Sequence, residues 1–403
     1  MKILIADKLP AFLPERLRER GHDVTVSPSL AGDALSAALA ELAPEVLVVR
    51  STEVRAPQLE AGAALGLVIR AGAGVNTIDL ETASRRGVFV ANCPGKNAVA
   101  VAELTLAHLL ALDRRLPDNV AALREGRWAK KTLGSGRGLL GRTLAVIGAG
   151  AIAREVIARA KAFGMKVRVH SRSLTPEDAA ALGAAWAGSV VDACRDADAL
   201  TVHVALTPDT RGLIGEEALS ALRAGAYVVN TARGGIVDEA ALARHIAERG
   251  LRAGLDVYEH EPKGGEGAFD DAIGRDAGVY GTHHIGASTD QAEEAVAEEV
   301  ARIISAYRRT GRPTSCVNLA EQTPATHMLV VRHEDRVGVL ASVLETLRAA
   351  EVNVQEMENI VFSGAHAACA RIQLDHAPGD DVVVALRARE HVFAVALVAL
   401  GGA

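Results

Sequence analysis

The chain has 403 residues, which is too long for one ordinary hydrophobic core and favours two or three domains. Its 49% hydrophobic and 23% charged residues are typical of a soluble globular protein. The formal net charge of −6 comes without a basic block, which argues against a nucleic-acid partner. The longest apolar stretch, Ala98 to Leu112, contains charged or polar residues and is too short to cross a bilayer. The start of the chain has no signal-peptide pattern, so we expect a cytoplasmic protein.

Cysteine and histidine spacing gives no sign of a metal site or a disulfide framework. The cysteines are far apart in the chain and show no Cys-x-x-Cys spacing: Cys93, Cys194, Cys316 and Cys369. We predict reduced, buried thiols rather than disulfides or zinc ligands. His283 and His284 are adjacent, so their side chains diverge and make a poor metal pair.

The first part of the chain alternates apolar strands with helices. The predicted strands are Ile3–Ala6, Val46–Val49, Leu67–Ile69 and Phe89–Ala91, with a helix at Leu13–Arg20. Short Gly-rich connections between alternating strands and helices predict a parallel, doubly wound sheet.

The same pattern restarts after a long apolar helix from Val99 to about Leu112 and a polar stretch at 126–138. The expected strands of this second sheet are Leu144–Ile147, Val167–His170, Ala199–Val204, Tyr227–Asn230, Arg252–Leu255 and Val279–Gly281. The fold class is therefore α/β, with two Rossmann-like parallel sheets.

A helix is predicted from Ser288 to Thr310, because Ser288 and Gln291 have capping-box spacing and basic residues fill the last turn. A turn-rich linker is expected over 313–325. The tail then predicts strand, helix, two strands, helix and strand, which gives a small α+β ferredoxin-like domain. The tail elements are Met328–Val331, Gly338–Ala350, Val352–Asn359, Ala367–Leu374, Asp380–Arg389 and Phe393–Ala399.

A dinucleotide-binding fingerprint, G-x-G-x-x-G/A, follows the strand that ends at Ile147. Gly148 allows the tight turn, Gly150 lets backbone N–H groups approach a pyrophosphate, and Ala153 permits close packing of helix on strand. An Ala-rich helix can match this pattern by chance, but the flanking strand and helix favour a cofactor site.

The second strand of this unit ends at Ser171 and Arg172, where an NAD site would have an acidic residue for the ribose. A hydroxyl beside a guanidinium suits a 2′-phosphate, which favours NADP over NAD. The alternative is that Arg172 is a solvated turn residue or stacks on adenine.

Three polar residues lie in Gly- or Pro-marked turns after apolar runs: Arg233, Glu261 and His284. The guanidinium can hold a carboxylate through a bidentate pair. The imidazole can take a hydroxyl proton, and the carboxylate can orient the imidazole and stabilise its charged form. The trio predicts oxidation of a 2-hydroxy acid. A further Gly-rich loop, residues 70–76, either presents backbone N–H groups to an anion or is an ordinary turn.

These motifs, together with residues 49–52, 230–238 and 255–258, resemble those of the D-isomer-specific 2-hydroxyacid dehydrogenases over residues 1 to about 315. The resemblance implies a discontinuous substrate-binding domain (1–98 and 288–315) around an inserted nucleotide-binding domain (99–287). It also implies that Arg233 binds the substrate carboxylate and that Glu261 pairs with His284, the acid/base. The implied cofactor contacts, for NAD or NADP, are Gly148, Gly150, Ala151, Ile152, Ser171, Arg172, Thr231, Ala232 and Asp256.

Within this family the motifs are most similar to those of members that act on 3-phosphoglycerate, the first step of serine synthesis. The resemblance assigns the substrate to Arg50, Arg70, Lys130 and the loop residues Ala73, Gly74 and Val75. Lys130 stands where similar sequences have Arg, so it keeps the charge but loses the bidentate geometry; it could equally be an ordinary surface residue. His283 replaces a usual Pro, which makes the backbone that holds His284 harder to predict, and Asn76 replaces a usual Asp.

The tail, residues 325–403, resembles an ACT regulatory domain. The implied effector site is His333, Asp335 and Asn353, in which Asp335 suits an amino acid's ammonium and repels its carboxylate. Val337 replaces a usual Pro in the same loop. We expect a homodimer or homotetramer with a small-molecule substrate and an amino-acid effector.

Two alternatives to this function remain open. One is an NADPH-dependent reductase of glyoxylate or hydroxypyruvate, which the Arg172 interpretation favours. The other is a non-catalytic sensor of dinucleotide and amino acid, against which the complete trio argues, because a sensor needs no proton-transfer pair.

Overall fold

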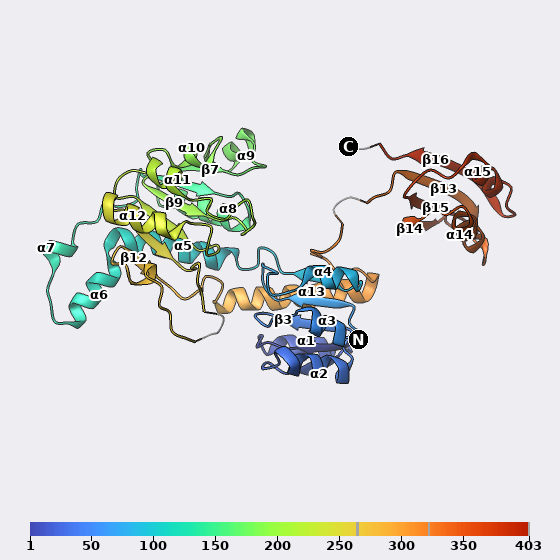
Figure 1. The fold of residues 1–403 in the computed structure, drawn as a ribbon, viewed down its shortest axis with the longest axis horizontal. Coiled ribbons are helices and arrows are strands. Elements are labelled where there is room, and N and C mark those ends of the chain that lie inside the picture. The colour runs from blue at the N-terminus through green and yellow to red at the C-terminus, as the bar shows by residue number, and fades with distance from the viewer. Residues whose placement is uncertain (263–265, 321–322, 402–403) are drawn as a thin grey trace. The chain divides into compact units, whose positions relative to one another are not determined.

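The structure is a computed structural model that describes residues 1–262, 266–320 and 323–401. The chain forms two compact units, Met1–Asn318 and Leu319–Ala403. The first unit holds two parallel sheets and the second an antiparallel one (Figure 1). The predicted fold class is confirmed.

The first parallel sheet is built from strands β1 (Lys2–Ile5), β2 (Asp23–Val26), β3 (Val46–Val49), β4 (Leu67–Arg70) and β5 (Phe89–Asn92). Its helices are α1 (Phe12–Glu19), α2 (Gly32–Leu42), α3 (Ala56–Ala61) and α4 (Leu80–Arg85). The strand order is β2-β1-β3-β4-β5. Both faces are buried, because Ile3 and Ile5 pack on one side with α1 while Leu4 packs on the other with α2. The sequence patterns did not predict β2 or α2–α4.

The second sheet has the order β12-β11-β10-β9-β6-β7-β8. Its strands are β6 (Thr143–Ile147), β7 (Lys166–His170), β8 (Ala185–Trp186), β9 (Ala199–Val202), β10 (Tyr227–Asn230), β11 (Arg252–Leu255) and β12 (Val279–Gly281). Its helices are α5 (Ala98–Arg114), α6 (Leu116–Arg124), α7 (Lys130–Leu133), α8 (Ala151–Ala162), α9 (Pro176–Ala181), α10 (Val190–Cys194), α11 (Glu216–Ala221) and α12 (Glu239–Arg249), with a 3-10 turn η1 at Ile273–Arg275. Every predicted strand of this sheet is present.

Two helices link the parallel sheets. Helix α5 leaves the first sheet and packs on α8 and on β10 and β11 of the second. Helix α13 (Asp290–Thr310) then returns, and its Val296, Val300 and Ile304 belong to the core of the first sheet (Figure 1).

The predicted start of α13 is wrong by a residue or two. The N-cap is Thr289, whose hydroxyl accepts a hydrogen bond from the N–H of Ala292 at 3.2 Å, whereas the N–H of Ser288 donates to the carbonyl of Ile285. Both residues are good caps by type, and the preceding turn decides between them.

The predicted linker also begins later than expected. Cys316 forms an antiparallel β-bridge with Ala91 of β5, and the Asn318 side chain accepts a hydrogen bond from Val90 N at 2.8 Å. Residues 316–318 therefore belong to the first sheet, while residues 321–322 of the predicted linker lie outside the described residues.

The second unit contains β13 (His327–Glu334), α14 (Val339–Ala349), β14 (Val354–Val361), β15 (Ala367–Leu374), α15 (Asp380–Arg387) and β16 (Val392–Ala399). The antiparallel strand order is β14-β15-β13-β16, as in a ferredoxin-like fold. Leu329, Val343 and Leu386 join one face of this sheet to its helices. Every predicted element of the tail is confirmed.

All four cysteines, which lie in the described part of the chain, are free thiols. No helix among the described residues is long and apolar enough to cross a membrane.

Candidate active site

The candidate site lies where β10, β11 and β12 end. These strands are neighbours and parallel, so the loops that follow them meet at one edge of the sheet. Arg233 follows β10, Glu261 follows β11 and His284 follows β12. All three line one cleft of about 1290 Å³, whose other wall comes from loops of the first sheet. The predicted trio is thus brought together.

Glu261 and His284 form a hydrogen-bonded pair. His284 Nδ1 lies 2.8 Å from Glu261 Oε2, and the other carboxylate oxygen accepts a hydrogen bond from Tyr258 N at 3.0 Å. Burial is the largest single influence on the pKa of Glu261 and raises it, but the hydrogen bonds and charge of His284 outweigh burial, so the pKa is lowered overall. Glu261 is therefore an anion at neutral pH and orients the imidazole of His284 through their hydrogen bond.

The backbone of His284 is in the left-handed region, with φ of +54°. Such a conformation is uncommon for a residue with a side chain and must be held by its surroundings. Asp256, which is 1% exposed, does this from the end of β11. One of its carboxylate oxygens accepts hydrogen bonds from Thr282 Oγ1 (2.6 Å) and Ile285 N (2.8 Å), and the other from Gly286 N (2.8 Å).

The same network extends to helix α5. His108 Nε2 lies 3.2 Å from Thr282 Oγ1, and burial lowers the pKa of His108, with the charge of Asp256 opposing the shift. The sequence patterns did not indicate His108 or Thr282. Thr282 lies in a motif that was singled out, but nothing in the local sequence marks His108, since its partners are more than 140 residues away. The Asp256 carboxylate is hydrogen-bonded within the protein, and its predicted contact with the cofactor stays a prediction.

Arg233 is held by a turn that Asn230 closes. The Asn230 amide donates to the Arg233 carbonyl at 2.9 Å and accepts from Ala232 N at 3.0 Å. Burial lowers the pKa of Arg233, and the charge of Glu261 opposes this shift. Gly74 from the first sheet comes close, because a Cβ at that position would lie 2.7 Å from an Arg233 nitrogen. The Gly-rich loop 70–76 thus faces the guanidinium.

The dinucleotide turn has the shape that the fingerprint predicts. Gly148 has φ of +108°, and a Cβ there would lie 2.3 Å from the carbonyl oxygen of His203. Gly150 is the N-cap of α8, and a Cβ on it would meet no described atom within 4 Å. The first N–H groups of the helix, at Ala151 and Ile152, have no partner within the helix and can meet a pyrophosphate. Thr231 is buried, and its hydroxyl forms a hydrogen bond of 2.9 Å with the hydroxyl of Thr105. A pyrophosphate fits this end of the helix.

The cofactor-selectivity residues follow β7. Arg172 is 80% exposed, and its Nη1 lies 3.4 Å from Oδ2 of Asp209, which is also exposed. Ser171 is half-buried. This weak surface pair leaves the guanidinium free to meet a ligand. Preference for NADP over NAD stays a prediction.

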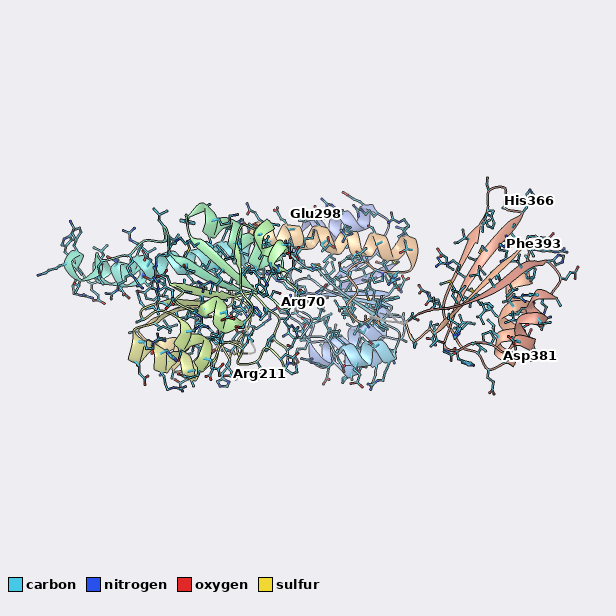
Figure 2. The ribbon with its side chains drawn as sticks, turned by 90° about the horizontal axis from the view of Figure 1, so that it is seen from above. Arg70, Arg211, Glu298, His366, Asp381 and Phe393 are labelled. Atoms are coloured by element: carbon cyan, nitrogen blue, oxygen red, sulfur yellow. The ribbon has the colours of Figure 1, made fainter. Side chains whose placement is uncertain are left out.

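Two of the predicted substrate cations lie in the cleft. Asp7 holds the loop that carries Arg50 by accepting hydrogen bonds from the N–H groups of Arg50, Ser51 and Thr52 at 2.6–3.1 Å. Arg70 lies between the elements of the two parallel sheets (Figure 2), and its buried Nε has no hydrogen-bond partner among the described residues. Burial lowers the pKa of Arg70, with contributions from Arg233 and Arg50. The carbonyl of Ala73 is tied to the Asn92 amide at 2.6 Å, and Val75 follows in the same loop.

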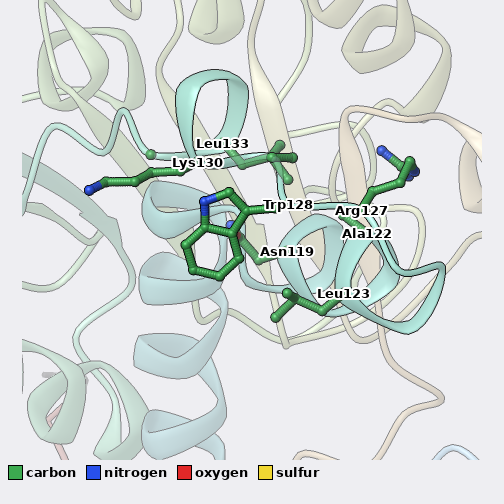
Figure 3. Close-up of a pocket in the computed structure, with 9 residues that line it drawn as sticks. Asn119, Ala122, Leu123, Arg127, Trp128, Lys130 and Leu133 are labelled. Carbon is green, nitrogen blue, oxygen red and sulfur yellow. The ribbon is translucent and has the colours of Figure 1, made fainter.

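Lys130 is not in the cleft. It lines a separate hollow of about 380 Å³ on the arm formed by α6 and α7, beside Trp128, which is 82% exposed (Figure 3). Within one chain, Lys130 does not line the cleft that holds Arg50 and Arg70. The predicted role of Lys130 in substrate binding stays a prediction.

The predicted effector residues are split within the second unit. His333 is buried, with Nδ1 2.6 Å from the Glu334 carbonyl and Nε2 3.2 Å from the Asn359 amide oxygen. Asp335 follows β13 at the same end of the sheet, where its N–H donates to the carbonyl of His366. Asn353 precedes β14 at the opposite end, where its N–H donates to Asp375.

A site that can hold a carboxylate, move a proton beside it and face a dinucleotide defines the class of dinucleotide-dependent 2-hydroxy acid dehydrogenases. Residues 106–286 match the family model of the D-isomer specific 2-hydroxyacid dehydrogenase NAD binding domain. Residues 106–286 of the chain therefore belong to the D-isomer-specific 2-hydroxyacid dehydrogenase family.

Several curated relatives carry the same name. The chain is 38% identical to a D-3-phosphoglycerate dehydrogenase of Methanocaldococcus jannaschii over 79% of this chain and 60% of that protein. It is 39% identical to the enzyme of the same name from Rattus norvegicus, over 74% of this chain and 55% of the other. The chain therefore spans less than two thirds of the length of these relatives. An NAD+-bound 3-phosphoglycerate dehydrogenase of Entamoeba histolytica has a similar structure (TM-score 0.66, 25% identity, 79% of this chain and 99% of that one).

Proposed function

We propose that the chain oxidises 3-phosphoglycerate to 3-phosphohydroxypyruvate, a step in L-serine synthesis. The observation that carries the proposal is the convergence of Arg233 and the His284–Glu261 pair in a cleft whose other wall holds Arg50 and Arg70. The names of the relatives support the choice of substrate.

Each member of the trio has a separate task in this reaction. The Arg233 guanidinium binds the substrate carboxylate and so places the C2 hydroxyl beside His284. With Nδ1 donating to Glu261, the neutral imidazole has its free lone pair on Nε2, which takes the hydroxyl proton during oxidation. Glu261 then stabilises the charged ring. A bound nicotinamide dinucleotide supplies the hydride acceptor, and the turn at Gly148–Ile152 would hold its pyrophosphate.

A second candidate is NADPH-dependent reduction of glyoxylate or hydroxypyruvate. The observation that favours it is the end of β7, where Ser171 and the exposed Arg172 stand in place of an acid. A guanidinium attracts a 2′-phosphate, whereas an acid would repel it.

Initial rates in the reductive direction separate the two candidates. Phosphohydroxypyruvate, hydroxypyruvate and glyoxylate are each assayed with NADH and with NADPH. We expect the highest kcat/KM with phosphohydroxypyruvate, and a preference for hydroxypyruvate or glyoxylate would reject the first proposal. Arg172→Ala should raise the KM for NADPH more than that for NADH, and equal changes would remove Arg172 from cofactor choice.

We also propose that the chain works as a homo-oligomer. The arm of α6 and α7 exposes Leu116, Leu123 and Trp128, an apolar surface that a second copy can cover. Analytical ultracentrifugation of the wild type and of Trp128→Ser is the test. We expect the wild type to be at least a dimer and the variant to have a higher dissociation constant for self-association.

An amino-acid effector site in residues 325–403 would likewise need two copies, because His333 and Asn353 lie at opposite ends of one sheet. Rates with and without L-serine test this part of the proposal. Inhibition that Asn353→Ala abolishes would support it, and unchanged rates would reject serine as the effector.

A further inference from the structure

The two substrate-side arginines differ in their counter-charges. Arg50 Nη1 lies 2.7 Å from Glu293 Oε1, and both side chains line the cleft. No ion pair of Arg70 or Arg233 with a carboxylate is present among the described residues. A negative ligand entering the cleft therefore meets two guanidinium groups without a paired acid and a third that Glu293 already occupies.

The position of Glu293 is fixed by the fold. It lies in the first turn of α13, where its N–H donates to the carbonyl of the cap residue Thr289 at 2.9 Å. The loop just before that cap carries His284. Arg50 is equally anchored, since three backbone N–H groups of its loop bind Asp7. Neither backbone is free to withdraw, so the pair opens only by side-chain rotation.

Both partners are accessible to a ligand, because Arg50 is 29% and Glu293 36% exposed. An ion pair at this exposure is weak and can be opened. A phosphate that reaches Arg50 must nevertheless either displace the Glu293 carboxylate or lie beside it, and like charges at that distance repel. A neutral group such as a hydroxyl meets no such opposition.

We propose that Glu293 is a specificity-determining residue that competes with the substrate's distal anionic group for Arg50. It weakens the binding of phosphorylated hydroxy acids relative to those with an uncharged end. The inference rests on the proposed function, because it places the substrate carboxylate on Arg233 and the distal group toward Arg50.

The test is Glu293→Gln, which keeps the size and the hydrogen-bonding capacity of the side chain and removes the charge. Glu294→Gln is the matched control, since Glu294 is the next residue of the same helix turn, is exposed and does not line the cleft. The readout is kcat/KM for phosphohydroxypyruvate divided by kcat/KM for hydroxypyruvate. We expect Glu293→Gln to raise this ratio about fivefold through KM, the upper range for an exposed ion pair, and the control to leave it unchanged.

An unchanged ratio in Glu293→Gln, or an equal rise in the control, would overturn the inference. If the wild type reduces hydroxypyruvate alone while Glu293→Gln gains activity on the phosphorylated substrate, the proposed function fails and the inference stands. If the wild type uses phosphohydroxypyruvate and Glu293→Gln does not raise the ratio, the proposed function stands and the inference fails.

A binding measurement covers the case in which neither substrate is turned over. Thermal shifts with 3-phosphoglycerate and with glycerate are compared in the same three proteins. Glu293→Gln should respond to 3-phosphoglycerate at about fivefold lower concentration, with a smaller change for glycerate. Equal responses of all three proteins to both ligands would overturn the inference.

Discussion

The two walls of the cleft are held in different ways. On the side of the second sheet, His284, Glu261 and Asp256 share a continuous hydrogen-bond network, and Asp256 is 1% exposed. On the side of the first sheet, the guanidinium of Arg50 forms an ion pair with the partly exposed carboxylate of Glu293. A buried network fixes atoms within a narrow range, whereas an exposed ion pair opens easily. We infer that the wall formed by the second sheet sets the reaction, and that the wall formed by the first sheet sets the choice of substrate.

The largest expected effect is on the side of the second sheet. His284→Ala removes the proposed acceptor of the hydroxyl proton and should lower kcat by about 10² or more, the usual contribution of general acid–base catalysis. Steady-state rates and circular dichroism of the variant check this. A loss below tenfold with an unchanged fold would exclude His284 from proton transfer.

Asp256→Asn tests whether the network positions His284. The amide can still accept hydrogen bonds at one atom but not at the other, so at least one of the bonds from Thr282, Ile285 and Gly286 is lost and the loop loosens. A small misplacement of a catalytic group is costly, and we expect kcat to fall about tenfold to hundredfold. Dinucleotide affinity, measured by fluorescence titration, shows whether the loss comes instead from the cofactor site. If affinity alone changes, Asp256 does not position His284.

Arg50→Ala tests the other wall. The proton-transfer network is intact in this variant, so kcat should be nearly unchanged, while KM for the phosphorylated substrate should rise about tenfold through loss of a charge-assisted contact. KM for hydroxypyruvate should change less. A fall in kcat without a change in KM would contradict the division between the two walls.

The trio could be found from the sequence because each residue stands in a Gly- or Pro-marked turn after an apolar run and carries a group that the reaction needs. The structure adds that β10, β11 and β12 are parallel neighbours, so the loops that follow them meet at one edge. The sequence could not place Lys130, because the direction of the α6–α7 arm depends on packing rather than on any local motif. The α13 cap was misplaced because Ser288 and Thr289 are both favoured cap types, and residue type alone points to the serine. Glu293 and His108 were missed for a common reason. Each meets a partner on an element distant in the chain, and no spacing rule within one segment reveals such a pair.

His108→Leu gives the smallest expected effect and shows how far the network reaches. Thr282 Oγ1 donates to Asp256, so its lone pair is free to accept from His108 Nε2–H. Leucine fills a similar space against Gly254 but donates nothing, and kcat should fall about threefold. His108→Gln can restore the donor and should recover most of the loss, whereas His22→Leu, at a buried histidine between α1 and β2, should leave kcat unchanged. Equal rates in the Leu and Gln variants would show that His108 only fills space.

The pH dependence of stability gives His108 a second readout. Burial holds the pKa of His108 below its ordinary value of 6.5, so at acidic pH the unfolded chain binds a proton that the folded chain does not. Wild-type stability should therefore fall as the pH drops below about 6.5, and part of this loss should be absent in His108→Leu. The difference in Tm between pH 8 and pH 5.5 measures it. An identical difference in both proteins would mean that the ring of His108 is also charged in the fold, and then a neutral Nε2–H would not be what holds Thr282.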